Sequence, residues 1–218
     1  KTLQAIVYIC SFPGQKTLIV CPTSLAYNWQ DEFQKFAPSI RTCIVQGTPE
    51  EREALISGQD GEYDVWITTY PLIRKDTESY QKQKYDHIFL DEAQFIKNPS
   101  SLGAKAVKSI PADHRFALTG TPIENALSEL WSIFDFIMPG FFPRYSKFSE
   151  LYEKPIMRGE DERVMQELKL RIKPFILRRM KKQVLRELPD KIETMRMAEM
   201  TKKQEKIYLS YLSRIQSE

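Results

Sequence analysis

The sequence predicts an α/β fold in which a parallel β-sheet carries helices on both faces. Short apolar runs alternate about five times with segments of helical period, the order that produces parallel sheets. The runs are apolar at consecutive positions, as expected for strands that are buried on both sides. With 218 residues, 42% of them hydrophobic, the chain is long enough for one such domain and a smaller addition.

Five apolar runs are the predicted strands, and residues that favour a turn or a helix start follow them. They cover residues 18–21, 42–45, 65–67, 88–90 and 116–118. A helix is predicted after the first strand, because Leu25, Trp29, Phe33 and Phe36 recur at helical spacing. Further helices are predicted to begin at Thr2, Pro49 and Tyr70. The helix predicted after the fifth strand carries Leu127, Leu130, Phe134 and Ile137.

The character of the sequence changes after Ile137. Residues 138–143 (MPGFFP) form an aromatic, proline-rich break, and only helical segments follow it. We therefore expect a sheet domain at residues 1–138 and a helical appendage at residues 139–218. The aromatic residues Phe141, Phe142, Tyr145 and Phe148 are expected to pack the appendage onto the sheet domain. Both termini lie inside helical patterns, so we expect the chain to be a piece of a longer protein.

Charge and cysteine usage narrow the class of protein. The net charge is only +3, so binding of nucleic acid must come from local patches. The cysteines Cys10, Cys21 and Cys43 are odd in number and match no zinc spacing, which favours buried, reduced thiols. No apolar run reaches the length of about 20 residues that spans a bilayer, and no signal-peptide pattern is present. We expect no membrane partner and no secretion.

Polar residues follow four of the predicted strands. They are residues 22–24 (PTS), 68–70 (TTY), 91–92 (DE) and 119–121 (TGT). In parallel sheets the ligand site lies beyond the carboxyl ends of the strands. The sequence therefore predicts that these residues share one site.

The acidic pair Asp91 and Glu92 stands directly after an apolar run. Asp91 is predicted to hold Mg²⁺, a hard ion that prefers oxygen ligands. Glu92 is predicted to orient and deprotonate an attacking water, the positioning role that phosphoryl transfer requires. The alternative is a pair of solvated acids that cap the next helix.

Lys1 and Thr2 open a helical pattern. In a phosphate-binding loop, such a pair gives a lysine for the β- and γ-phosphates and a hydroxyl for Mg²⁺ at a helix N-terminus. The glycines that normally precede the pair are absent here. The pair is common by chance, and the alternative is an exposed helix start.

Hydroxyl groups make up the rest of the predicted edge. Thr119 and Thr121, on either side of Gly120, are expected to hydrogen-bond Glu92 or Gln94 and to report the nucleotide state to the nucleic-acid side. The alternative for Thr121 is a simple helix cap. Hydroxyls at Thr23, Ser24 and Thr69 are expected to bind backbone phosphates, a role compatible with helix capping.

A basic stretch covers residues 169–186, with eight basic residues and no acidic one. Apolar residues at helical spacing within and after it predict an amphipathic helix that includes Leu177 and Leu188. We expect contact with a phosphate backbone or an acidic partner. The residues expected to make it are Arg178, Arg179, Lys181 and Lys182.

Taken in order, these segments resemble the first lobe of a superfamily-two helicase-like ATPase, and more closely the Swi/Snf class of chromatin remodellers and their bacterial relatives. The stretch LTGTPIENALSELW at residues 118–131 is the most specific match, and residues 175–191 resemble the helical protrusion of the class. The other matching segments are KTLQ at 1–4, LIVCPTSLAYNW at 18–29, ITTY at 67–70 and DEAQFIKN at 91–98.

The resemblance implies a RecA-like lobe of the P-loop NTPase class, with ATP and Mg²⁺ as cofactors and double-stranded DNA as the track. It implies phosphate and Mg²⁺ binding by Lys1 and Thr2, Mg²⁺ binding by Asp91, and activation of water by Glu92. It also implies a location in the nucleus, or in the cytoplasm at the nucleoid in a bacterium.

Two parts of the family pattern are missing, namely the glycine loop before Lys1 and the second lobe with its arginine finger. We therefore expect this chain alone to be inactive, and we expect the second lobe, and in some settings a protein client, as partners. Two alternatives stay open. One is a non-catalytic module that docks on DNA or protein through the basic stretch, and the other is an RNA helicase lobe.

Overall fold

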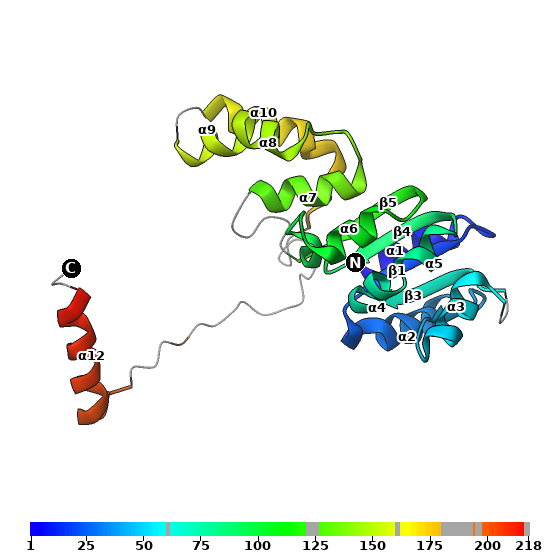
Figure 1. The fold of residues 1–218 in the computed structure, drawn as a ribbon, viewed down its shortest axis with the longest axis horizontal. Coiled ribbons are helices and arrows are strands. Elements are labelled where there is room, and N and C mark those ends of the chain that lie inside the picture. The colour runs from blue at the N-terminus through cyan, green and yellow to red at the C-terminus, as the bar shows by residue number, and fades with distance from the viewer. Residues whose placement is uncertain (60–61, 121–126, 160–161, 180–193, 195–197, 216–218) are drawn as a thin grey trace. The chain divides into compact units, whose positions relative to one another are not determined.

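The computed structural model describes residues 1–59, 62–120, 127–159, 162–179, 194 and 198–215. The chain forms two compact units, Lys1–Pro174 and Phe175–Glu218. The first contains a parallel sheet of five strands in the order β2-β3-β1-β4-β5 (Figure 1). The strands are β1 (Thr17–Cys21), β2 (Thr42–Ile44), β3 (Val65–Thr69), β4 (Tyr85–Asp91) and β5 (Ala112–Leu118). The predicted fold class is confirmed.

Helices precede, join and follow the strands (Figure 1). Around the sheet these are α1 (Thr2–Cys10), α2 (Ala26–Phe36), α3 (Pro49–Ser57), α4 (Tyr70–Lys75), α5 (Thr77–Gln81) and α6 (Leu102–Lys108), with the 3₁₀ turns η1 (Thr23–Leu25) and η2 (Ala93–Ile96). After β5 come α7 (Leu127–Ile137), α8 (Tyr145–Phe148), the π-helical η3 (Ser149–Glu153), α9 (Lys154–Met157), α10 (Glu162–Ile172) and the 3₁₀ turn η4 (Lys173–Phe175). The second unit contains α12 (Lys202–Ile215).

Two apolar clusters cover the two faces of the sheet. On one face, α1 and α2 pack residues such as Ile6, Trp29 and Phe33 against Ile19 and Phe89. On the other face, helices α3 to α7 supply the packing residues, which include Ile56, Ile73, Tyr80, Val107 and Phe136. Consecutive strand residues alternate between the clusters, which explains why the runs at residues 18–21, 65–67 and 88–90 are apolar at consecutive positions.

The register of the strands sets their carboxyl ends in one row. Cys21 of β1 pairs with Thr69 of β3, and the preceding β1 residue pairs with Leu90 of β4. Asp91 of β4 pairs in turn with Leu118 of β5. Because all strands are parallel, the residues that follow them emerge at one edge of the sheet. This edge is where the site was predicted.

Aromatic side chains of residues 141–148 pack against α7, the last helix of the predicted sheet domain, as expected from the sequence. The Phe142 ring lies 5.4 Å from that of Phe134 on α7 and 4.9 Å from that of Phe148. Trp131 Nε1 donates a hydrogen bond to the Pro143 carbonyl at 2.9 Å. The predicted boundary between residues 138 and 139 lies inside the first compact unit, and a separate domain at residues 139–218 stays a prediction.

Three details differ from the sequence prediction. Phe36, the last residue of α2, is 45% exposed. Cys10 is exposed, whereas Cys21 and Cys43 are buried and free. The helix predicted through the basic stretch ends at Ile172, and residues 176–179 are not helical.

Pro174 explains why α10 ends at Ile172. A proline disfavours helical geometry in the residue before it and lacks the N–H that an interior helical position donates. The continuation of the predicted helix from residue 180 to residue 188 lies outside the described residues. Within the part of the chain that the structure describes, no helix is long and apolar enough to cross a bilayer.

Candidate active site

Asp91 is held by several hydrogen bonds at the carboxyl edge of the sheet. It is 8% exposed, and its Oδ2 accepts a hydrogen bond from Trp29 Nε1 on α2 at 2.9 Å. Its Oδ1 accepts from the Glu92 backbone N–H at 3.0 Å. Its carbonyl accepts from the Tyr70 hydroxyl at the start of α4, also at 2.9 Å. Three donors therefore fix the carboxylate and the main chain of Asp91.

Glu92 has an unusual backbone conformation. Its φ of 50° and ψ of 55° are left-handed, and it is the one non-glycine residue with a positive φ among the described residues. Such a conformation costs a non-glycine residue roughly 1–2 kcal/mol. The strain lies at the first residue after β4, where it turns the chain sharply out of the sheet.

A side-chain relay joins Glu92 to the end of β5. The Glu92 carboxylate accepts a hydrogen bond from Gln94 Nε2 at 2.7 Å, and Gln94 Oε1 accepts one from the Thr119 hydroxyl at 3.0 Å. All three residues are partly buried. The single amide of Gln94 therefore contacts both the acidic pair and the threonine–glycine turn.

Lys1 lies at the same edge. A Cβ atom at Gly120 would stand 3.8 Å from the Lys1 ammonium nitrogen, so the lysine head lies over the turn that follows β5. Thr2 is the first residue of α1, with Lys1 as its N-cap. Lys1, the acidic pair and Thr119 are thus gathered by the relay and by this approach to Gly120.

The remaining predicted residues lie at the ends of β1 and β3, in the second unit, or outside the described residues. Thr23 and Ser24 are exposed on η1, just past β1, whereas Thr69 is 6% exposed at the end of the neighbouring strand β3. Arg178 and Arg179 are exposed in the second unit. The last group, Thr121, Lys181 and Lys182, lies outside the described residues.

Two neighbours of Asp91 are kept neutral. Burial, followed by the negative charge of Asp91, raises the pKa of the Tyr70 hydroxyl far above its usual range. Burial and the same charge raise the pKa of the Cys21 thiol to about 12. Tyr70 therefore remains a hydrogen-bond donor at neutral pH, and Cys21 is not a thiolate nucleophile.

The residues at the edge suit Mg²⁺ better than a zinc-type metal. In the described ranges, no three histidine, cysteine or acidic side chains gather to hold a metal by themselves. The edge offers carboxylate oxygens at Asp91 and Glu92, and Thr2, next to Lys1 at the start of α1, carries a hydroxyl. Mg²⁺ is typically held by one or two carboxylates together with waters and substrate phosphates, and this donor set fits it.

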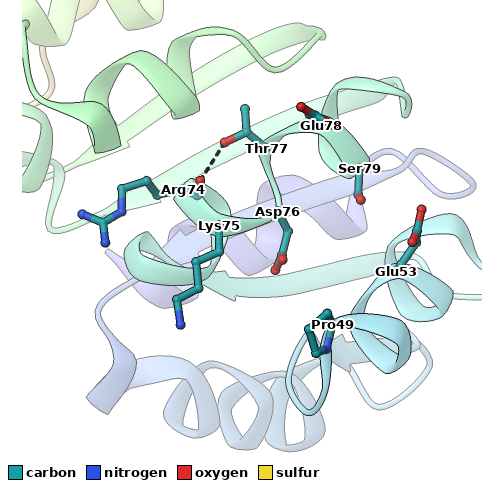
Figure 2. Close-up of a pocket in the computed structure, with 8 residues that line it drawn as sticks. All are labelled: Pro49, Glu53, Arg74, Lys75, Asp76, Thr77, Glu78 and Ser79. Atoms are coloured by element: carbon teal, nitrogen blue, oxygen red, sulfur yellow. Dashed lines mark hydrogen bonds between the residues drawn. The ribbon is translucent and has the colours of Figure 1, made fainter.

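A separate hollow of about 300 Å³ opens elsewhere on the surface (Figure 2). Its lining consists of Pro49, Glu53, Arg74, Lys75, Asp76, Thr77, Glu78 and Ser79. None of the predicted site residues lines it, and it lacks an acidic pair at a strand end. The chemistry therefore points to the carboxyl edge and not to this hollow.

The sequence prediction missed Trp29 as a site residue, and it placed Tyr70 at the edge without its contact to Asp91. Helical spacing assigns Trp29 to the core, where it does lie at 1% exposure. One general rule could have raised the question, since a buried indole or phenol usually finds a hydrogen-bond partner. The sequence gives no indication that the partner of both would be Asp91.

This parallel sheet, with a lysine-headed helix, an acidic pair and a threonine–glycine turn at one edge, defines an ATPase lobe of the RecA-like class. The chain matches the SNF2-related domain over residues 1–217. It therefore belongs to the SNF2-related family of Swi/Snf-class proteins.

Relatives and solved structures agree on the family. The chain is 38% identical to the TATA-binding protein-associated factor MOT1 of Saccharomyces cerevisiae, a match that covers 89% of the chain and 11% of MOT1. It is 33% identical to the human chromatin-remodeling ATPase INO80, over 100% of the chain and 15% of INO80. The Sulfolobus solfataricus SWI2/SNF2 ATPase core in complex with dsDNA matches with a TM-score of 0.76 and 38% identity. That match covers 100% of this chain and 46% of the solved one.

Proposed function

We propose that this chain is the first lobe of an ATP-dependent motor that tracks along double-stranded DNA. The observation that carries the proposal is the relay from Glu92 through Gln94 to Thr119, with Lys1 at the adjoining turn. It joins groups suited to phosphate, metal and water activation at one sheet edge. The family and the likeness to a core solved with dsDNA support a DNA track.

In this proposal the nucleotide phosphates bind where α1 begins. Lys1 contacts the β- and γ-phosphates, and the helix N-terminus favours their negative charge. Thr2 and Asp91 hold Mg²⁺. When bound, the ion neutralises the charge that develops on the phosphate oxygens.

Glu92 orients the attacking water and accepts its proton. Its carboxylate already accepts a hydrogen bond from Gln94, which restricts the rotamer before substrate arrives. The left-handed backbone at Glu92 directs this side chain away from the path that a regular strand would give it. Such strain is found where an active site is pre-organised.

Gln94, Thr119, Gly120 and Thr121 couple hydrolysis to DNA. The relay through Gln94 supports this role, because Gln94 hydrogen-bonds both the Glu92 carboxylate and the Thr119 hydroxyl after β5. A change at the carboxylate therefore alters the hydrogen bond of Thr119. Thr23, Ser24 and Thr69 contact the phosphate backbone, as do the cations of the predicted protrusion. The exposure of Thr23, Ser24, Arg178 and Arg179 supports this assignment.

The proposed motor requires more than this chain. The chain spans between a tenth and a fifth of the length of the first curated relatives and 46% of the matched solved core. A second lobe would supply an arginine finger, a group worth about 10³–10⁵ in rate in related enzymes. The lobe by itself is therefore proposed to be inactive. A nucleoprotein client in the nucleus or nucleoid is proposed by analogy with the relatives named above.

The experiment that tests the proposal uses the full-length protein as its gene encodes it. Glu92→Gln should lower DNA-stimulated ATP hydrolysis by about 10²–10⁴-fold, the usual contribution of a general base, and leave ATP binding intact. Glu78→Gln is the matched control, because it removes an exposed carboxylate from the separate hollow (Figure 2). Normal turnover in Glu92→Gln would end the assignment.

The nature of the track is tested in the same assay. Duplex DNA should stimulate the ATPase more strongly than single-stranded RNA of equal length. Stronger stimulation by RNA would favour the RNA helicase alternative. Salt-sensitive DNA binding without any ATP hydrolysis by the full-length protein would favour the docking module.

A further inference from the structure

We propose that Trp29 is a positioning residue for Asp91, and that its indole N–H sets how well the lobe binds magnesium with ATP. The inference rests on the proposed function and extends it to a residue outside the acidic pair. Trp29 belongs to α2, whereas Asp91 ends β4, so the contact joins two elements that are 62 positions apart in the sequence.

The hydrogen bond is buried and specific. Trp29 is 1% exposed and Asp91 is 8% exposed, and the distance from Nε1 to Oδ2 is 2.9 Å. Where water is largely excluded, no solvent molecule readily replaces the indole as a donor. Nε1–H is also the only donor that an indole has. The single donor of the Trp29 side chain is therefore used by this carboxylate.

The two oxygens of Asp91 are held from two sides. Oδ1 accepts from the Glu92 backbone N–H, which comes from the same turn, and Oδ2 accepts from Trp29. One bond alone would leave the carboxylate free to rotate about its Cβ–Cγ axis. The second bond, from a separate helix, fixes that rotation. Each oxygen retains a further lone pair for a water or a metal ion.

A residue that orients a metal-binding carboxylate has a predictable effect. Loss of such an outer partner typically lowers metal affinity or activity by 10–100-fold. Trp29 also packs against Phe33, with ring centroids 6.3 Å apart, so it contributes to the core as well. The experiment must separate these two roles.

Trp29→Phe removes the donor and retains an aromatic ring. In the full-length protein, the affinity for an ATP analogue with a non-hydrolysable β–γ bridge is measured by calorimetry, once in EDTA and once with Mg²⁺. We expect the affinity in EDTA to match that of the wild type. The gain in affinity on adding Mg²⁺ should fall by about 10–100-fold. An unchanged gain would overturn the proposal.

Trp66→Phe is the matched control. Trp66 is 4% exposed, lies in the cluster on the opposite face of the sheet, and donates Nε1 to the Leu55 carbonyl at 2.9 Å. The same substitution there also removes a buried indole donor, so it reproduces any general loss of stability. The affinity of Trp66→Phe for the ATP analogue should rise on adding Mg²⁺ by as much as that of the wild type. An equal loss in both variants would assign the effect to stability and overturn the proposal.

A double variant tests whether Trp29 acts through Asp91. In an Asp91→Asn background, Trp29→Phe should change the magnesium-dependent gain no further. A further loss would show a separate route and would contradict the positioning role. Where Trp29→Phe does not fold, benzothienylalanine at position 29 keeps the bicyclic shape and deletes the N–H, and the same outcomes apply.

The failure of this inference can be told apart from the failure of the proposed function. A wild-type protein that neither gains ATP affinity with Mg²⁺ nor hydrolyses ATP would overturn the proposed function itself. A wild type that does both, together with a Trp29→Phe variant that behaves identically, would overturn only the role of Trp29.

Discussion

The hydroxyl of Thr119 donates a hydrogen bond at 3.0 Å to the side-chain carbonyl of Gln94, which stands 25 positions earlier in the chain. Gln94 donates in turn to Glu92 at 2.7 Å. The amide is therefore an acceptor on one side and a donor on the other. Any movement of the Glu92 carboxylate changes the orientation of Gln94 and hence the partner of Thr119.

Thr119→Val should uncouple DNA from hydrolysis. Valine has nearly the shape of threonine but cannot donate to Gln94. We expect the basal ATPase rate and ATP affinity to stay at wild-type values, and stimulation by DNA to fall roughly tenfold, within the usual range of coupling between sites. The measurement is the ATPase rate of the full-length protein with and without duplex DNA.

Thr17→Val serves as the control for this substitution. Thr17 is buried at the opposite end of β1, and its hydroxyl contacts His87 Nδ1 at 3.5 Å. The control loses a buried hydroxyl without touching the relay, so its DNA stimulation should be normal. Full stimulation of Thr119→Val would show that the relay does not carry the coupling.

Asp76→Asn should destabilise the first unit strongly. Asp76 accepts two hydrogen bonds of 2.7 Å from the Arg52 guanidinium, and the two side chains are only 13% and 9% exposed. Removing the carboxylate leaves a buried cation without its counter-charge, a change that costs about 3–5 kcal/mol. The shift is measured by urea unfolding followed by circular dichroism.

Asp113→Asn provides the comparison for the buried pair. Its partner Lys84 lies at 3.0 Å, but the side chains are 71% exposed for Lys84 and 49% for Asp113. An exposed pair contributes at most about 1 kcal/mol. Equal destabilisation by Asp76→Asn and Asp113→Asn would mean that burial does not distinguish the two pairs.

The strands and the site edge were predictable because each depends on local composition. A strand that is buried on both faces is mostly apolar at consecutive positions, and runs such as residues 18–21 and 88–90 have this composition. The parallel arrangement then sends every strand end to the same edge. The gathering of Asp91, Thr119 and Lys1 follows from topology once the strands are known.

Features that depend on three-dimensional contact were not predictable. Periodicity places Trp29 in the core but cannot assign its N–H to Asp91, a residue from another element. The sequence does not indicate the left-handed backbone of Glu92, because the residues that usually adopt this conformation are glycine and asparagine, not glutamate. In the basic stretch, the apolar spacing favours a helix, whereas residues 176–179 are not helical and the rest of the predicted helix lies outside the described residues.

The first unit should become less stable as the pH rises, because the Cys21 thiol keeps its proton in the folded chain and loses it in the unfolded chain. Burial raises the pKa of Cys21 to about 12 in the folded chain, whereas an unfolded thiol has a pKa of about 8.5. Above pH 8.5 the unfolded chain loses this proton and the folded chain keeps it, so unfolding becomes more favourable. By pH 9.5 the loss is about 1.4 kcal/mol.

Cys21→Ala isolates this contribution. Alanine does not titrate, so the variant should lack this part of the pH dependence. The unfolding free energies of both proteins are measured by urea unfolding between pH 7.5 and pH 9.5, a range of about one unit on either side of the ordinary thiol pKa. The difference between the two proteins at each pH gives the contribution of Cys21. Two parallel stability curves would contradict the raised pKa of Cys21.

Glycine at position 92 should be more stable than alanine at the same position. Both Glu92→Gly and Glu92→Ala delete the carboxylate and its bond to Gln94, so they differ only in backbone preference. With φ at 50°, alanine retains the left-handed penalty of roughly 1–2 kcal/mol, which glycine does not pay. Glycine loses more backbone entropy on folding, about 0.5–1 kcal/mol. We therefore expect Glu92→Gly to exceed Glu92→Ala by about 1 kcal/mol in unfolding free energy, with both variants inactive.

The same pair of substitutions at Lys105 should give the opposite order. Lys105 is exposed within α6, where alanine is favoured over glycine by about 1 kcal/mol. A reversal of sign between the two positions, measured by urea unfolding, would identify Glu92 as a residue held in a conformation it does not prefer. If alanine is the more stable at both positions, the turn after β4 is unstrained. In that case Glu92 owes its orientation to the Gln94 hydrogen bond alone.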